Sequence, residues 1–167
     1  MKRGFKVVSE YEDKGINLPK RGTDFSAGYD IEAAENIVIP SLFGKYSIAQ
    51  MHPEDVDDIP TYMKPTMVPT GIKCYISDQE ALFIYNRSSS SKRGLMLANN
   101  VAVIDADYYN NPNNEGHIFL PMWNLGARDI HIKKGERLAQ GVFQQYFLAD
   151  VDVTGGQRTG GIGSTGL

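Results

Sequence analysis

The sequence contains few of the residues from which disulfides and metal clusters are built. It has one cysteine, Cys74, and three histidines that lie far apart, His52, His117 and His131. A single cysteine excludes an intrachain disulfide and a cysteine-rich zinc site, and the histidines lack the HExxH spacing of a zinc hydrolase. Positive charge is not in excess either, since 17 Lys and Arg residues face 20 Asp and Glu residues, for a formal net charge of −3. This balance argues against broad binding to nucleic acid or to an anionic membrane, while a small anion would need only a local positive pocket.

Long apolar stretches are also missing. No run approaches the roughly 18 apolar residues of a membrane span. The opening segment MKRGFKVVSEYEDKG has no continuous apolar core after its basic residues, so it does not resemble a signal peptide. We expect a soluble, cytoplasmic protein whose cysteine stays reduced, with neither nucleic acid nor a membrane as a partner.

Helical periodicity is scarce, and the glycine-rich nucleotide motifs GxGxxG and GxxxxGK[ST] are absent. Short apolar or alternating runs, separated by Gly, Asn, Asp and Pro, predict the strands of an all-β sandwich or barrel. A chain of 167 residues, 41% of them hydrophobic, suits one such domain. The runs are Phe5–Ser9, Ile31–Pro40, Thr66–Ile76, Ala81–Asn86, Val101–Asp105, His117–Trp123, Asp129–Lys133 and Leu138–Leu148.

Two segments could form short helices. Ser88–Leu97 begins with a row of serines, which favour helix N-termini. His52–Met63 carries proline and acidic residues near its start, as helix N-termini often do, but Pro60 limits it to a turn or two. An acidic loop is an equally good interpretation of the second segment.

The last part of the chain, Thr154–Gly166, reads TGGQRTGGIGSTG, and six of its thirteen residues are glycine. A flexible tail is the ordinary interpretation of such a segment. It could also wrap around phosphates, because glycines let backbone N–H groups approach phosphate oxygens, and Ser, Thr and Arg158 add further donors.

Four further segments carry polar residues beside predicted strands. Taken singly, each has an ordinary structural explanation as a turn, a helix cap or a hairpin. They are SAGYDIEAA (26–34), NRSSSSKRGL (86–95), NNVAVIDADYY (99–109) and KKGERLAQGVF (133–143).

In this order, and followed by the glycine-rich segment, they resemble the five ordered motifs of the dUTPases, the deoxyuridine triphosphate nucleotidohydrolases. AGYD matches the first motif, RSS with a following basic residue and Gly-Leu the second, VIDADY the third, GERLAQ the fourth and GGIGSTG the fifth. The resemblance runs from about Phe5 to Leu167. It implies a distorted jelly-roll or β-barrel domain over residues 1–153, with an insertion at about 41–67, and an arm over 154–167 that closes over the active site.

The resemblance also implies an activity and an assembly. Enzymes of this family hydrolyse dUTP to dUMP and pyrophosphate by attack of water on the α-phosphorus, which keeps uracil out of DNA and supplies dUMP for thymidylate synthesis. They are typically homotrimers of jelly-roll-like subunits with shared active sites.

The motif match implies roles for the residues around the base and the attacked phosphorus. Asp105 would hold and activate the attacking water, as a carboxylate can by accepting its proton or hydrogen bond. The ring of Tyr108 would pack on the deoxyribose, where the 2′-hydroxyl of a ribonucleotide would clash. Asn99 would hydrogen-bond the uracil edge, and Ile162 would cover the base.

Other matched residues would hold the phosphates and the metal. Asp30 would act near Mg²⁺ through water, the ion being held mainly by the triphosphate. The expected phosphate and substrate ligands are Arg87, Ser88, Ser89, Gln140, Arg158, Gly163, Ser164 and Thr165.

The sequence departs from the family pattern at several positions. Ser89 and Ala102 stand where glycine is usual, and Ile162 stands where the family has a phenylalanine. Two insertions, at about 41–67 and at 109–116, and the Arg-Ser-Ser motif resemble dUTPases of Gram-positive bacteria and their phages. Some of these phage enzymes also bind regulatory proteins, so the insertions could form a partner surface or be plain surface loops.

A related enzyme, dCTP deaminase, shares the fold and an Arg-Ser-Ser segment. Its chemistry needs a glutamate to move protons, in a strand that reads roughly Leu-Glu-x-x-Asn. The matching strand here is Leu120–Asn124, and Pro121 stands at the glutamate position. Deamination, alone or beside hydrolysis, is therefore the weaker alternative.

Overall fold

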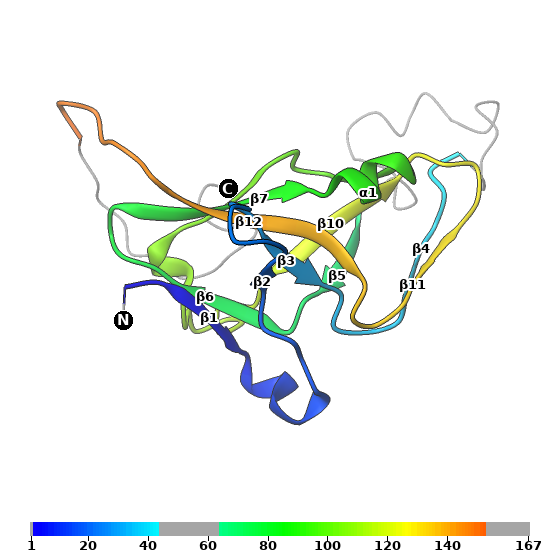
Figure 1. Cartoon of the computed structure of the whole chain (residues 1–167), viewed down its shortest axis with the longest axis horizontal. Coiled ribbons are helices and arrows are strands. Elements are labelled where there is room, and N and C mark those ends of the chain that lie inside the picture. The colour runs from blue at the N-terminus through cyan, green and yellow to red at the C-terminus, as the bar shows by residue number, and fades with distance from the viewer. Residues whose placement is uncertain (1, 44–63, 153–167) are drawn as a thin grey trace, which may run out of the picture.

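The computed structural model describes residues 2–43 and 64–152 (Figure 1). Most of the regular structure in these two ranges is β-strand, with one short α-helix, α1 (Ser88–Lys92), and two 3₁₀ helices, η1 (Ser9–Lys14) and η5 (Ala106–Tyr108). The strands are β1 (Gly4–Val7), β2 (Lys20–Arg21), β3 (Tyr29–Glu32), β4 (Ile37–Ile39), β5 (Thr66–Pro69), β6 (Ile72–Tyr75), β7 (Glu80–Asn86), β8 (Leu95–Leu97), β9 (Ala102–Ile104), β10 (Phe119–Asn124), β11 (Ile130–Ile132) and β12 (Arg137–Gln145).

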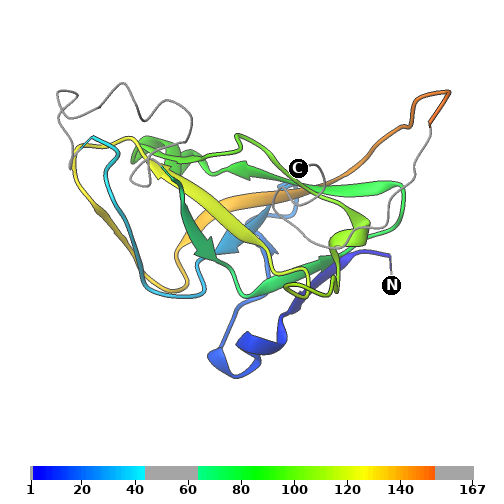
Figure 2. The ribbon, with the colours of Figure 1, turned by 180° about the vertical axis from the view of Figure 1, so that it is seen from behind.

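The strands form a five-stranded sheet in the order β2-β3-β12-β7-β9, a three-stranded sheet in the order β5-β10-β8, and the pairs β1-β6 and β11-β4. All of these pairings are antiparallel. Figure 2 shows from behind how the strands wrap around one interior. Side chains that alternate along β7, β10 and β12 fill this interior, and Leu82, Leu120 and Leu138 are fully buried in it. The all-β, jelly-roll-like prediction is confirmed.

The structure corrects several boundaries. The run Ser88–Leu97 was expected to be one helix, but the helix ends at Lys92, and residues 95–97 form strand β8. Gly94 makes the reversal between them, with φ +79°, a conformation that glycine adopts without strain. Beyond it, Leu95 and Leu97 are buried and Met96 is exposed, which is the alternation of a strand.

Two runs that were each expected to be one strand are pairs of strands. Ile31–Pro40 divides into the end of β3 and all of β4, and Thr66–Ile76 divides into β5 and β6 around Gly71, whose φ is +68°. The helix η1 was not predicted, because its sequence SEYEDK has no apolar period. The second expected helix, His52–Met63, lies outside the described residues, as does most of the 41–67 insertion.

No helix in the described ranges is both long enough and apolar enough to span a membrane.

The 109–116 segment is tied to the body of the domain. Glu115 forms an ion pair with Lys73 of β6 and accepts hydrogen bonds from the backbone N–H and hydroxyl of Ser9, at 2.9 and 2.6 Å. Lys73 also donates to Asn110 Oδ1 at 2.8 Å. The side chain of Lys73 is 10% exposed and that of Glu115 33%, so the pair is only partly screened by water. The segment is therefore an anchored loop and not a free protrusion.

These contacts predict a pH dependence of stability. The hydrogen bond from Lys73, followed by those from Ser9, lowers the pKa of Glu115 from 4.5 to about 2. A pKa that folding lowers means that the carboxylate stabilises the fold fully above about pH 4.5, and that this contribution disappears as the pH falls toward 2. The unfolding free energy of the Glu115→Gln protein should therefore fall less steeply over this interval than that of the wild type.

Denaturant unfolding at fixed protein concentration, followed by circular dichroism, measures this slope. Glu12→Gln is the matched control, because Glu12 lies exposed on η1. Equal slopes for the wild type and Glu115→Gln would contradict the assignment.

Candidate active site

Five of the predicted site residues lie around one hollow, which we call the anion pocket. Its volume is about 290 Å³. Asp30, Arg87, Ser88, Ser89 and Gln140 line it, together with three small residues of the 22–28 loop. Arginine and serine donors beside a glutamine make a site suited to phosphate oxygens.

Strand register brings the anion pocket together. Asp30 of β3 pairs with Gln140 of β12, and Gln140 pairs in turn with Tyr85 of β7. Arg87 follows the last residue of β7 and caps helix α1 through its backbone, since its carbonyl accepts from Ser90 N and Ser91 N. The serines were expected to supply that cap and instead lie within the helix.

Ser90 fixes the helix to the sheet. Its hydroxyl is buried and donates to the carbonyl of Leu138 at 2.7 Å. Ser88 and Ser89, which precede it, are left lining the pocket. Ser90 therefore attaches the helix to β12, whereas Ser88 and Ser89 line the anion pocket.

An ion-pair network joins two residues of the pocket, Asp30 and Arg87, to Arg137, which lies beside it. Asp30 Oδ1 lies 2.8 Å from Arg87 Nε, and Asp30 Oδ2 lies 3.1 Å from Arg137 Nη1. Arg87 Nη1 also donates to Ser89 Oγ and to the carbonyl of Arg137, both at 3.3 Å. Two guanidinium groups against one carboxylate leave a net positive charge, which favours an anion.

Arg137 was not among the predicted site residues. It lies 107 positions from Asp30 in sequence, so no local pattern indicates the pair. The available signal was its place inside GERLAQ, one of the segments that was singled out.

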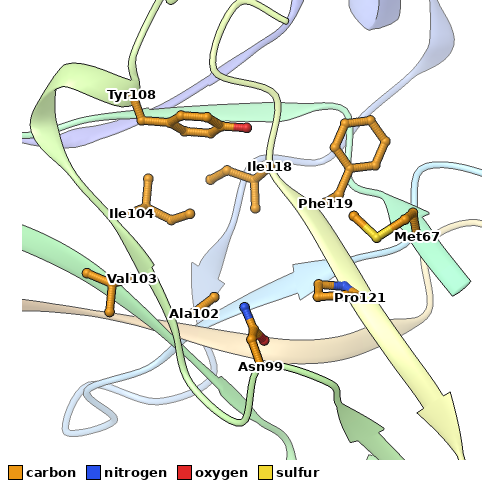
Figure 3. Close-up of a pocket in the computed structure, with 9 residues that line it drawn as sticks. All are labelled: Met67, Asn99, Ala102, Val103, Ile104, Tyr108, Ile118, Phe119 and Pro121. Atoms are coloured by element: carbon orange, nitrogen blue, oxygen red, sulfur yellow. The ribbon is translucent and has the colours of Figure 1, made fainter. Parts of the chain in front are cut away.

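A second hollow, of about 120 Å³, lies in a different part of the sheet, and we call it the hairpin pocket (Figure 3). Asn99 and Tyr108, the two residues expected to read the base and the sugar, both line it. The Tyr108 ring lies over one side of the pocket and Asn99 faces it from the other. The lining residues are Met67, Asn99, Ala102, Val103, Ile104, Tyr108, Ile118, Phe119 and Pro121.

Asp105 lies between β9 and the helix η5 that carries Tyr108. It is the N-cap residue of η5, and its carbonyl accepts from Tyr108 N at 3.2 Å. The short helix η5 thus fixes the orientation of the Tyr108 side chain relative to Asp105.

The two pockets share no lining residue, and sheet geometry explains why. Leu82 pairs with Ile104, so Asp105 lies level with Ala81, near the start of β7. Arg87 follows the opposite end of the same strand, six residues farther on. At about 3.3 Å per residue, the two backbone positions lie roughly 20 Å apart. Within one chain, Asp105 and Arg87 therefore face different ends of the sheet.

The described residues contain no group of three or more His, Cys, Asp or Glu side chains placed to hold a metal ion. The Asp30 carboxylate has the chemistry to contact a metal ion indirectly, by accepting a hydrogen bond from a metal-bound water. A carboxylate can accept about four hydrogen bonds, and the two arginines leave room for one from a metal-bound water. The single thiol, Cys74, is buried, which raises its pKa to about 12 and makes it a poor nucleophile or ligand.

The remaining predicted site residues fall outside the described ranges. They are Arg158, Ile162, Gly163, Ser164 and Thr165, all in the 154–167 arm.

Comparisons with known proteins agree with one another. The dUTPase family model matches residues 51–166. The chain is 46% identical to the deoxyuridine 5′-triphosphate nucleotidohydrolase of Lactococcus lactis, over 98% of this chain and 97% of that protein. The corresponding protein of Escherichia coli K12 is 29% identical over 96% of this chain and 95% of its own length.

Solved structures show the same fold. The dUTPase from Streptococcus mutans superposes with a TM-score of 0.71 and 40% identity, over 89% of this chain and 99% of that one. The dUTPase from phage phi11 of Staphylococcus aureus has a TM-score of 0.65 over 92% of this chain and 96% of that one, and its identity of 17% supports the fold alone.

Two glycines of the anion pocket provide a test of its shape. A Cβ at Gly28 would lie 2.5 Å from Gln140 Oε1 and 3.1 Å from Gln140 Cβ, whereas a Cβ at Gly22 would meet nothing within 4 Å. Gly28→Ala should therefore displace the side chain of Gln140 and weaken pyrophosphate binding, roughly three- to tenfold for one lost hydrogen bond.

Calorimetric titration with pyrophosphate measures the affinity, and Gly22→Ala in the same pocket is the control. Unchanged affinity in Gly28→Ala would remove Gln140 from the anion site.

Proposed function

The chain belongs to the dUTPase family and hydrolyses dUTP, and from this premise we propose that its active site is assembled from the anion pocket of one chain and the hairpin pocket of another. The observation that carries the proposal is the separation of the two pockets. A water activated by Asp105 must attack a phosphorus whose phosphate chain is held by Arg87 and Ser88. Roughly 20 Å of strand lies between these residues in one chain, so a neighbouring chain has to supply one half.

In the anion pocket, Arg87, Ser88 and Gln140 bind the phosphate oxygens of dUTP. Asp30 holds Arg87 through Nε, which fixes the guanidinium before substrate arrives. Donors that are already oriented stabilise the charge that develops as the α-phosphorus is attacked, without reorganising during the reaction. Ser89 adds a hydroxyl at the same wall.

In the hairpin pocket, Asn99 hydrogen-bonds the uracil edge, and the ring of Tyr108 packs on the deoxyribose. The ring is 5% exposed and its hydroxyl donates to the carbonyl of His117 at 2.9 Å. A ring held in this way leaves no space for a ribose 2′-hydroxyl. Asp105, which follows β9 beside this pocket, orients the attacking water and accepts its proton. As the water oxygen bonds to the α-phosphorus, the bond from that phosphorus to the α,β-bridging oxygen breaks and pyrophosphate leaves.

We propose that the reaction uses Mg²⁺. A mutant of the phage phi11 dUTPase coordinates a structural Mg(II) ion in its solved structure. In this chain the ion would be held mainly by the triphosphate oxygens, and it would neutralise part of their charge. Asp30 would contact it through a bound water, using the acceptor capacity that the two arginines leave.

The assembly follows from the kind of contact. The anion pocket and the hairpin pocket are different surfaces, so joining them makes a head-to-tail contact, which forms a ring when the rotation between neighbouring chains closes. We propose the homotrimer typical of the family as that ring. The 154–167 arm would close over the site, with Arg158, Ser164 and Thr165 on the terminal phosphate and Ile162 and Gly163 near the base.

The geometry disfavours deamination of dCTP at the same site. Pro121 lies in β10 and lines the hairpin pocket, and none of the nine lining residues is a carboxylic acid. The glutamate that moves protons in deamination thus has no carboxylate counterpart in this lining. A regulatory protein partner at the 41–67 insertion stays a prediction.

Asp105→Asn tests the role of the water-activating residue. The amide keeps the size of the side chain but cannot accept a proton, so turnover of dUTP should fall by several orders of magnitude while dUTP affinity changes little. Chromatographic product analysis and equilibrium binding measure the two effects. Asp107→Asn, two residues away on η5, is the control and should keep most of the activity; turnover within about tenfold of the wild type in Asp105→Asn would contradict the assignment.

Mixing two inactive variants tests the divided site. Asp105→Asn disables the hairpin half and Arg87→Ala disables the anion half, so each alone should be inactive. If the halves come from different chains, random mixing in equal amounts leaves about a quarter of the sites with two intact halves, and about a quarter of the wild-type turnover returns.

Coexpression with two affinity tags isolates the mixed trimers, in which one of every three sites has two intact halves, so about a third of the wild-type turnover is expected there. The two variants mixed only after purification give the baseline. Turnover no higher than this baseline would show that both halves come from one chain.

A further inference from the structure

The hydroxyl of Tyr108 is held from two sides, and one side is the inserted loop. The Tyr108 hydroxyl donates to the backbone carbonyl of His117 at 2.9 Å. The Asn114 side-chain amide donates to the same hydroxyl at 2.8 Å. The ring that lines the hairpin pocket is therefore fixed at its far end by a residue of the 109–116 loop.

A network of asparagines makes the loop rigid at this point. Asn111 is 5% exposed, and its amide nitrogen donates to the Tyr108 carbonyl at 2.9 Å and to Asn114 Oδ1 at 2.7 Å. Its own Oδ1 accepts from the backbone of Asn113 and Asn114, at 3.1 and 3.2 Å. The Asn114 amide is thereby oriented with its oxygen toward the loop and its nitrogen toward the tyrosine.

The end of the loop packs closely against the backbone of Tyr108. Gly116 has φ +79°, and a Cβ there would lie 2.6 Å from the carbonyl oxygen of Tyr108. Glu115 attaches the loop to Ser9 and Lys73. These contacts bind the loop to the backbone of Tyr108, to its hydroxyl and to the body of the domain.

We propose that Asn114 is a positioning residue for Tyr108, and that it thereby contributes to the choice of a deoxyribonucleotide over a ribonucleotide. The inference rests on the proposed role of Tyr108 as the residue that packs on the sugar. A phenol ring excludes a 2′-hydroxyl only if it cannot tilt away. The Asn114 bond opposes that tilt, because tilting the ring would leave a part-buried amide without its partner.

Asn114→Asp separates this bond from the folding of the loop. The carboxylate keeps the Oδ1 acceptor, which receives hydrogen bonds from the Asn111 side chain at 2.7 Å and from Gly116 N at 3.1 Å. It has no N–H to give to Tyr108, whose own hydroxyl proton is already used by His117. Asn113→Asp is the matched control, since Asn113 is the exposed neighbour that joins the network through its backbone N–H.

The measurement is kcat and KM for dUTP and for UTP, from which the ratio of the two kcat/KM values is taken. Asn114→Asp should lower this ratio roughly three- to tenfold, the size of one neutral hydrogen bond. KM for dUTP should rise while its kcat stays within about twofold, because the ring touches the sugar and not the reacting phosphorus. Asn113→Asp should keep the wild-type ratio.

Tyr108→Phe removes this bond together with the bond from the hydroxyl to the His117 carbonyl, and it leaves the loop sequence unchanged. It should lower the ratio by at least the same factor, and adding Asn114→Asp to it should change the ratio no further. If Asn114→Asp folds poorly, a wild-type ratio in Tyr108→Phe would still overturn the proposal, because that variant lacks the Asn114 bond.

The measurements distinguish a failure of the role of Asn114 from a failure of the role of Tyr108. A wild-type ratio in Asn114→Asp, together with a lowered ratio in Tyr108→Phe and Tyr108→Ala, would overturn the role of Asn114 alone. A wild-type ratio in Tyr108→Ala would show that Tyr108 does not select the sugar, and would overturn both the inference and the role on which it rests.

Discussion

The hydrogen-bonded ladder that β7 makes with β12 on one side and β9 on the other sets the distance between Arg87 and Asp105, the groups to which we assign the chemistry. The ladder with β12 runs along the whole of β7, from Glu80 to Asn86, and its side chains Leu82 and Ile84 are fully buried. Arg87 leaves one end of this strand, and Asp105 lies beside the other. Because an antiparallel register cannot slip by one residue without turning every buried side chain outward, the separation is as fixed as the core.

Two sets of contacts position the residues at the ends of the ladder. At one end, the Asp30 carboxylate holds Arg87 and Arg137, and Ser90 attaches the serine helix to β12. At the other end, η5 and the 109–116 loop hold Tyr108 by its backbone and its hydroxyl. In the divided site that we propose, each half would thus be oriented within its own chain before substrate or a second chain arrives, which would reduce the entropic cost of assembling the complete site.

Sequence reasoning found what depends on short-range pattern and missed what depends on long-range contact. The short apolar or alternating runs at β7, β10 and β12 predicted these strands, and five of the residues that the ordered segments indicated line the anion pocket. Strand β8 was missed because its residues continue the segment Ser88–Leu97, whose row of serines favoured a helix. The Asp30–Arg137 pair joins residues 107 positions apart, a separation that only the fold brings together. The inserted 109–116 loop was interpreted as a surface feature, since its chain of asparagines gives no hint that Asn114 reaches the hydroxyl of Tyr108.

In the divided site that we propose, one nucleotide contacts two chains at once. A crystal structure of the assembled protein with Mg²⁺ and α,β-imido-dUTP, an analogue that cannot be cleaved at the attacked bond, would show whether it does. We expect the uracil and sugar in the hairpin pocket of one chain, with Asp105 beside the α-phosphorus, and the phosphates on Arg87, Ser88 and Gln140 of the next chain. A nucleotide that contacts Asp105 and Arg87 of the same chain would show that the site is not divided.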